Sequence, residues 1–92
     1  MANATIRRLK VLLSSDIQQT PDSTFGRALA FNIDRDGRAF VWFETFPGDP
    51  GRSRVFCVIS DEGQLPMPHL RYITSAIDGD TDPVGYHLFQ AL

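Results

Sequence analysis

The sequence has a single cysteine, no surplus of one charge and no long apolar run. The one cysteine, Cys57, excludes an intramolecular disulfide and a cysteine-based zinc cluster, and it favours a reducing, intracellular setting. Nine basic and eleven acidic residues give a formal charge of −2. Because nucleic-acid binders carry a strong basic field, this balance argues against nucleic acid as a partner.

Runs of large apolar residues are short, as at Phe40 to Phe43, whereas a membrane-spanning helix needs about 20 apolar residues. Arg7, Arg8 and Lys10 precede the apolar stretch 11–13, which is shorter than the apolar part of a secretory signal. We therefore expect a cytoplasmic protein that neither spans a membrane nor is exported.

Hydrophobic residues nevertheless make up 42% of the chain and aromatic residues 11%. That content is enough to drive folding. For a chain of this size, surface scaling buries about two-thirds of the unfolded surface, which supports one core and leaves no room for a second domain. We predict a single β-rich domain over residues 1–92, with residues 1–4 as a flexible N-terminus.

Alternation of apolar and polar residues predicts a first strand. Within residues 5–14, Leu9, Val11 and Leu13 alternate with other side chains, which is the period of a half-buried strand. Residues 15–26 contain a proline and several turn-forming side chains. This composition indicates a connector that holds at most a short extended piece.

A β-hairpin is predicted at Asp36-Gly37, which lies between two apolar runs, because glycine adopts a positive φ without steric cost. Two registers remain open. A two-residue type I′ turn places Phe31 opposite Trp42, whereas a type I turn with a bulge at Gly37 places Phe31 opposite Val41. We favour the first register.

Three further apolar stretches predict strands at residues 54–60, 72–78 and 84–92, and a hairpin loop joins the last two. Segments rich in proline at 47–51 and 65–69 separate the strands, because proline cannot donate to a ladder. No segment has convincing helical periodicity. We predict an all-β fold, either a small antiparallel sandwich or a partly open barrel, with about six short strands.

The favoured register leaves a second apolar face on the hairpin. With Phe31 and Trp42 directed to one side, Val41 and Phe43 lie on the other, and Phe46 follows at the end of the strand. A small single sheet has little with which to cover such a face. We therefore expect Val41, Phe43 and Phe46 to bind another protein or a second copy of the chain, as a homodimer.

A second hypothesis is the binding of a small anion, such as a nucleotide, at a barrel mouth or at a junction between subunits. Arg54, Arg71 and His87 are the polar side chains proposed to anchor it, because guanidinium groups bind phosphate and carboxylate in a bidentate manner.

No motif supports catalysis or a cofactor. The segment from Asp78 to Asp82 alternates carboxylates as a calcium loop does, but Pro83 stands where that loop needs glycine. His69, His87 and Cys57 lack the sequence context of a metal site or of a nucleophile with its base. We expect a protein that is not an enzyme and that holds no metal or cofactor.

Several short blocks follow one another in a recognisable order. They are Thr20-Pro21, Gly37 to Glu44, Arg54 to Phe56, Leu65-Pro66 and Tyr86 to Gln90. Over residues 6–92, this order resembles a family of small uncharacterised proteins encoded by bacteriophages and prophages. The sequence departs from the family pattern at residues 78–82 and 67–69. The family has no assigned activity, so no residue role carries over. The resemblance implies a phage accessory protein that acts in the cytoplasm of a bacterial host, and it names no ligand. In the binding hypothesis above, a bacterial host protein is a possible partner.

Overall fold

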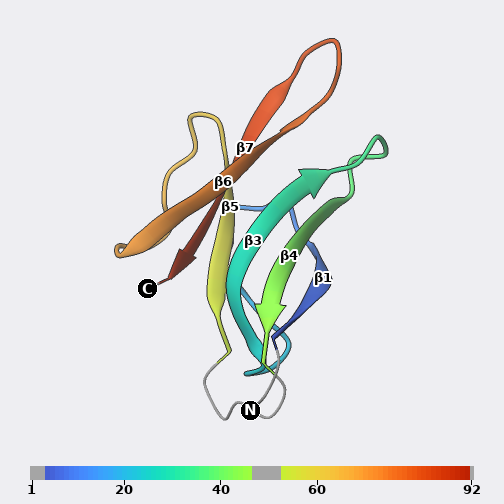
Figure 1. Ribbon diagram of the computed structural model, residues 1–92. Helices are drawn as coiled ribbons and strands as arrows, with labels where there is room; N and C mark the ends of the chain where they lie inside the picture. Colours follow the sequence, from blue (N-terminus) through green and yellow to red (C-terminus); the bar gives the residue numbers. More distant parts are fainter. Residues whose placement is uncertain (1–3, 47–52, 92) are drawn as a thin grey trace.

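The computed structural model describes residues 4–46 and 53–91, which form two antiparallel β-sheets packed face to face (Figure 1). The three-stranded sheet has the order β1–β4–β3 and consists of β1 (Thr5–Val11), β3 (Phe25–Ile33) and β4 (Ala39–Thr45). The four-stranded sheet has the order β2–β5–β7–β6 and consists of β2 (Gln18–Gln19), β5 (Val55–Ser60), β6 (Leu70–Asp78) and β7 (Val84–Ala91). The predicted all-β class is confirmed, in the form of a sandwich and not of a closed barrel.

The connector at residues 15–26 holds a short extended piece, β2, whose two residues pair with β5. The first strand is shorter than predicted, because it ends at Val11 and not at Ser14. The side-chain amide of Gln18 accepts from the Leu12 N–H at 3.0 Å and donates to the Leu12 carbonyl at 2.9 Å. Because this side chain takes both backbone groups of Leu12, the ladder ends at Val11.

The hairpin between β3 and β4 has the second of the two registers, so the favoured register is wrong. Phe31 lies opposite Val41 and not opposite Trp42. A shift of one residue exchanges the two faces of a strand. Phe31 and Val41 are therefore buried together, and Trp42 points out of the sandwich.

The turn explains this register. The Gly37 N–H donates to the Asp34 carbonyl at 3.0 Å, and Gly37 has a φ of 81°, which makes a type I turn with a bulge at the glycine. The Asp34 carboxylate fixes the turn, because its Oδ1 accepts from the N–H groups of Asp36 and Arg38 at 3.0 and 2.9 Å.

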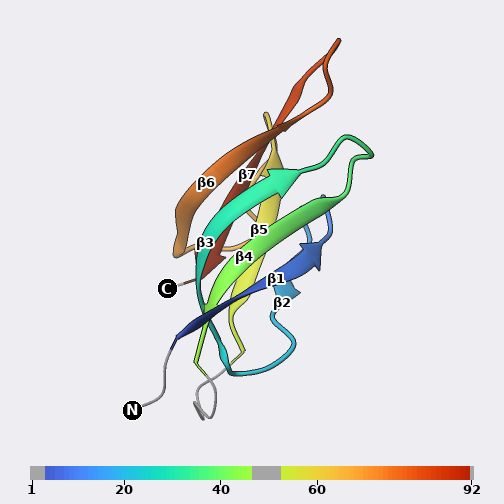
Figure 2. The ribbon, with the colours of Figure 1, turned by 45° about the vertical axis from the view of Figure 1, so that its right-hand side comes forward.

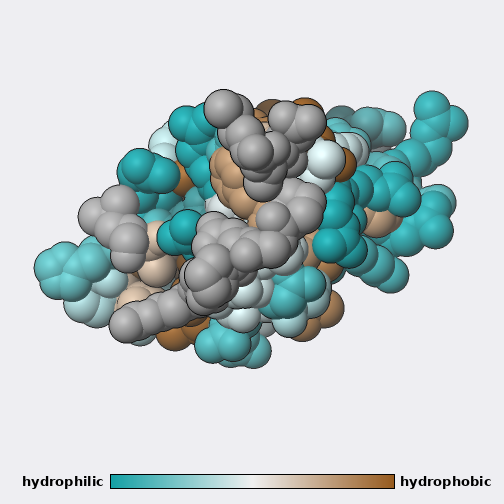
Figure 3. Space-filling view, turned by 60° about the horizontal axis from the view of Figure 1, so that its bottom comes forward, coloured by the Kyte–Doolittle hydropathy of each residue, from teal (hydrophilic) through white to brown (hydrophobic). Residues whose placement is uncertain are grey.

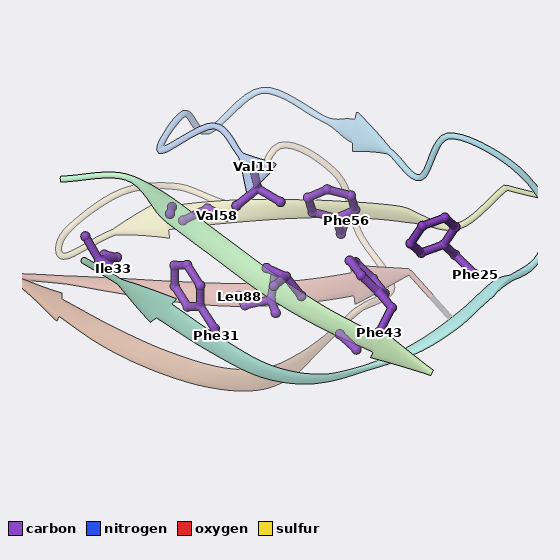
Figure 4. Close-up of a cluster of buried hydrophobic side chains, with 11 residues drawn as sticks. Val11, Phe25, Phe31, Ile33, Phe43, Phe56, Val58 and Leu88 are labelled. Atoms are coloured by element: carbon purple, nitrogen blue, oxygen red, sulfur yellow. The ribbon is translucent and has the colours of Figure 1, made fainter. Parts of the chain in front are cut away.

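Side chains of both sheets meet in one core (Figure 4). Phe43 is fully buried in the middle of it, with the ring centres of Phe25 and Phe56 at 5.5 and 5.7 Å from its own. The other buried members of the cluster are Val11, Ala28, Phe31, Ile33, Ala39, Val41, Val58 and Leu88.

One buried polar side chain ties the two sheets together. Gln90 on β7 is 3% exposed. Its Nε2 donates to the Gly26 carbonyl at 3.0 Å, and its Oε1 accepts from the Ala28 N–H at 3.1 Å. Both backbone groups belong to β3, an edge strand that lies beside β6 of the other sheet (Figure 2). Gln90 thus satisfies groups for which this edge has no strand partner.

Two expectations fall largely outside the described residues. Of the predicted flexible segment 1–4, only Ala4 is described, and the predicted turn at 47–51 is not described. In the described parts of the chain, no helix is long or apolar enough to cross a membrane.

Candidate functional site

Exposed apolar side chains gather on the outer face of the three-stranded sheet. Ile6, Leu29, Ala30 and Trp42 line a shallow hollow of about 390 Å³, which we call the apolar patch. Ile6 is 66% exposed and Leu29 41% exposed, and Trp42 between them is half-buried. Brown apolar residues also reach the surface beside hydrophilic ones in the space-filling view (Figure 3). Single exposed apolar residues are ordinary, but a contiguous group on one face marks a candidate contact surface.

Two features of the backbone create the patch. The hairpin register turns Trp42 outward, and a bulge between Ala28 and Ala30 places Leu29 outside as well. In a regular strand Leu29 and Phe31 would share a face. The favoured register put Phe31 and Trp42 on one side of the hairpin, and this is wrong, because Phe31 points into the core and Trp42 points outward.

Basic side chains lie on the same outer face as the apolar patch. Period-two alternation along β1 puts Arg8 and Lys10 on the same outer face as Ile6. The Arg8 guanidinium lies over the Phe40 ring, 4.5 Å from its centre. Arg27 also lies at this face, where its Nε is 3.7 Å from the carboxylate of Glu44.

The structure places the three predicted aromatic and aliphatic contact residues differently. Val41 and Phe43 are both 0% exposed, so they belong to the core and cannot meet a partner. Phe46, just beyond β4, is half-buried, and its ring lies against Gly26. The hairpin does have apolar residues at the surface, as predicted, but they are Trp42 and Leu29 and not Val41 and Phe43.

Two of the three predicted anion anchors come together at one end of the sandwich. Arg54 and Arg71 line a pocket of about 250 Å³, which we call the arginine pocket. Arg27, which the sequence did not single out, joins them there. The remaining lining residues are Gly26, Gln90 and Ala91.

His87, the third predicted anchor, lies outside the arginine pocket. On the outer face of the four-stranded sheet, its Nε2 donates to Asp61 Oδ1 at 2.8 Å, and its Nδ1 lies 2.7 Å from Ser75 Oγ. The Tyr72 hydroxyl lies 2.7 Å from the same Ser75 oxygen. The hydrogen bonds from His87 and from the Gly85 N–H lower the pKa of Asp61.

This chain of side chains contains an acid, an imidazole and a hydroxyl, the groups used in acyl transfer. None of them lines the apolar patch, the arginine pocket or the hollow between the hairpin tips at Asp34 and Gly79. A nucleophile needs a site beside it for the reacting carbonyl. The network instead fastens the turn at Asp61 to β7. Cys57 offers no nucleophile either, because it is buried and burial raises the pKa of its thiol.

A third hollow, of about 380 Å³, lies between the tips of two hairpins and is lined by Asp34, Arg35, Asp78 and Asp80 among others. Among the described residues, no group of three or more histidine, cysteine or acidic side chains has the arrangement of a metal site. We draw no function from this hollow.

Comparison with family models, curated proteins and solved structures finds no match. The functional argument therefore depends on the geometry of the chain's own residues.

Proposed function

We propose that this protein acts by binding another protein through the apolar patch. One observation carries the proposal: Ile6, Leu29 and Trp42 form a contiguous apolar surface on the outer face of a sheet whose inner face is already fully packed. Covering such a surface removes apolar area from water, and tryptophan is among the residues that contribute most to protein interfaces.

The charges around the patch favour a partner with acidic residues. Arg8, Lys10 and Arg27 lie on the same face as the patch. Glu44, opposite Ile6, is the one acidic side chain paired with any of them in the described residues. A two-fold dimer through this face would bring two copies of the same basic rim together, which costs energy. We therefore propose a different protein, with an apolar centre and an acidic rim, in preference to a homodimer.

The size of the molecule fits this role. It measures 47 × 29 × 16 Å, so each broad face can supply a contact of about 800 Å², the share that one partner buries in an ordinary interface. The resemblance to phage-encoded proteins supports an accessory role in the cytoplasm of a bacterial host. In this role the partner is a host protein, and the binding of one copy of the chain inhibits it.

The experiment compares two isoleucines of nearly equal exposure. Ile6 in the patch is 66% exposed, and Ile77 on β6 of the other sheet is 69% exposed. Tagged wild-type, Ile6→Asp and Ile77→Asp proteins are used to capture proteins from a bacterial lysate. We expect one host protein to be retained by the wild type and by Ile77→Asp, and lost with Ile6→Asp.

Equal loss of that protein with both variants would overturn the assignment of the patch. The mass of each variant in solution is measured in parallel, and circular dichroism confirms that both are folded. A wild-type dimer that Ile6→Asp converts to a monomer would replace the hetero-partner with a second copy and contradict the charge argument.

A further inference from the structure

The arginine pocket has a rigid floor. Gln90 lies at its base and is held by its two hydrogen bonds to Gly26 and Ala28. Because Gln90 belongs to β7 and both of these bonds go to the backbone of β3, this side chain joins the two sheets at the pocket. The Gln90 amide is therefore held in place before a ligand binds, which lowers the ordering cost of binding at this residue.

Three arginines converge on this floor from separate parts of the fold. Arg27 comes from β3, Arg54 immediately precedes β5, and Arg71 comes from β6. None of the described residues that line the pocket is acidic. Like charges repel, and the chain as a whole carries a formal charge of −2, so overall composition does not account for this local excess of positive charge.

The arginines are only partly compensated by the protein. The Arg27 pair with Glu44 is long, at 3.7 Å, and the Arg27 side chain is 63% exposed, so it contributes little. Arg54 Nε donates to the Phe25 carbonyl at 3.4 Å, which orients the side chain and adds no negative charge. Arg71 has no ion pair with any other described residue.

Guanidinium groups bind phosphate oxygens through paired N–H donors, and several of them together favour a doubly charged anion. A volume of about 250 Å³ lies below the usual range of about 300–1,000 Å³ for pockets that enclose a whole small molecule. We infer that the arginine pocket is a phosphate-binding site, for inorganic phosphate or for the phosphate group of a small metabolite. The residues that line this site do not include those that line the apolar patch, although Arg27 lies between the two.

The test is a nuclear magnetic resonance titration at constant ionic strength, with inorganic phosphate in one arm and glycerol 3-phosphate in the other. Saturable shifts are expected at the backbone amides of Gly26 and Ala91 and at the Gln90 side-chain amide. Arg54→Gln and Arg71→Gln should each weaken binding about tenfold, since a charge-assisted hydrogen bond contributes at least that factor. Tighter binding of glycerol 3-phosphate than of inorganic phosphate indicates that the ligand is a small metabolite. Equal binding of the two indicates that the site recognises the phosphate group alone.

Arg35→Gln is the matched control. Arg35 is also exposed, but it lies at the tip of the β3–β4 hairpin and does not line the arginine pocket. An equal loss with Arg35→Gln, or no saturable shift with either probe, would overturn the inference. If the glutamine variants fail to fold, the double variant Arg54→Lys/Arg71→Lys keeps the charge and removes the paired donors. Unchanged affinity in that variant would also count against the site. Ile6→Asp should leave phosphate binding intact, so failure here and failure at the apolar patch are distinguishable.

Discussion

The two outer faces of this sandwich differ in how many contacts and hydrogen bonds their side chains make within the chain itself. On the four-stranded sheet, Tyr72, Ser75, His87 and Asp61 bond to one another, and the Tyr72 ring packs edge-on against Phe89 at 5.7 Å. On the three-stranded sheet, the apolar patch has no such cover among the described residues. The network on the first face stabilises the fold, although Ile77 on the same sheet is exposed, and the apolar patch on the second face is the surface we propose for a partner. Substitutions should therefore affect stability on one face and binding on the other.

The largest effect is expected in the core behind both faces. Phe43→Ala removes a fully buried ring that contacts Phe25 and Phe56. A buried phenylalanine truncated to alanine costs about 3–5 kcal/mol. Chemical denaturation should show this loss, whereas Leu29→Ala on the patch should cost less than about 1 kcal/mol by the same measurement.

Gln90→Ala should come next. It leaves the Gly26 carbonyl and the Ala28 N–H without their partner in a buried setting. Each unsatisfied buried group costs about 1–3 kcal/mol, so we expect a loss of about 3 kcal/mol in the unfolding free energy. Hydrogen exchange at the Ala28 amide should be faster than in the wild type, because this amide loses its acceptor. Unchanged exchange there would contradict the role of Gln90 in joining the two sheets.

Breaking the network on the four-stranded sheet should have a smaller effect. His87→Ala removes the link between Asp61 and Ser75 and should lower the unfolding free energy by less than Gln90→Ala does, because these hydrogen bonds are exposed to solvent. Partner capture should not change. Ile6→Asp should show the reverse, with a stability change within about 0.5 kcal/mol and loss of capture. Equal stability losses in the two variants would remove the distinction between the faces.

The smallest expected effect is on the stability of the protein at acidic pH. The pKa values of Asp61 and Asp34 are lowered in the folded protein, mainly by the hydrogen bonds from His87 and from the Arg38 backbone. The stability that these groups contribute is therefore present above the ordinary aspartate pKa of about 3.9 and is lost as the pH falls through their lower folded values. Asp61→Asn should reduce the acid sensitivity of unfolding below about pH 4, and an unchanged profile would contradict the pKa direction.

Strand positions follow from the sequence because period-two alternation is local. The hairpin register is also locally encoded, in a signal that the prediction did not use. Aspartate at the first position of a type I turn and glycine at the fourth are the preferred residues, and Asp34 and Gly37 occupy those positions. Choosing the Asp36-Gly37 pair alone led to the other turn type, and hence to Val41 and Phe43 as contact residues.

The remaining features depend on contacts that no local pattern reports. The bulge that exposes Leu29 leaves no mark of its own in the alternation. The meeting of Arg27, Arg54 and Arg71 depends on the edge strand β3 lying beside β6, two segments far apart in the chain. His87 was predicted to anchor an anion together with Arg54 and Arg71, and it instead bonds Asp61, which follows β5 in a turn.

The most direct measurement uses Trp42, the single tryptophan of the chain, as an internal probe of the apolar patch. The captured partner is titrated into the wild type, Ile6→Asp and Ile77→Asp, and indole emission is followed. We predict a saturable blue shift in the wild type and in Ile77→Asp, and none in Ile6→Asp at the same concentrations. Binding of the partner to the wild type with no change in Trp42 emission would show that the contact lies elsewhere on the molecule.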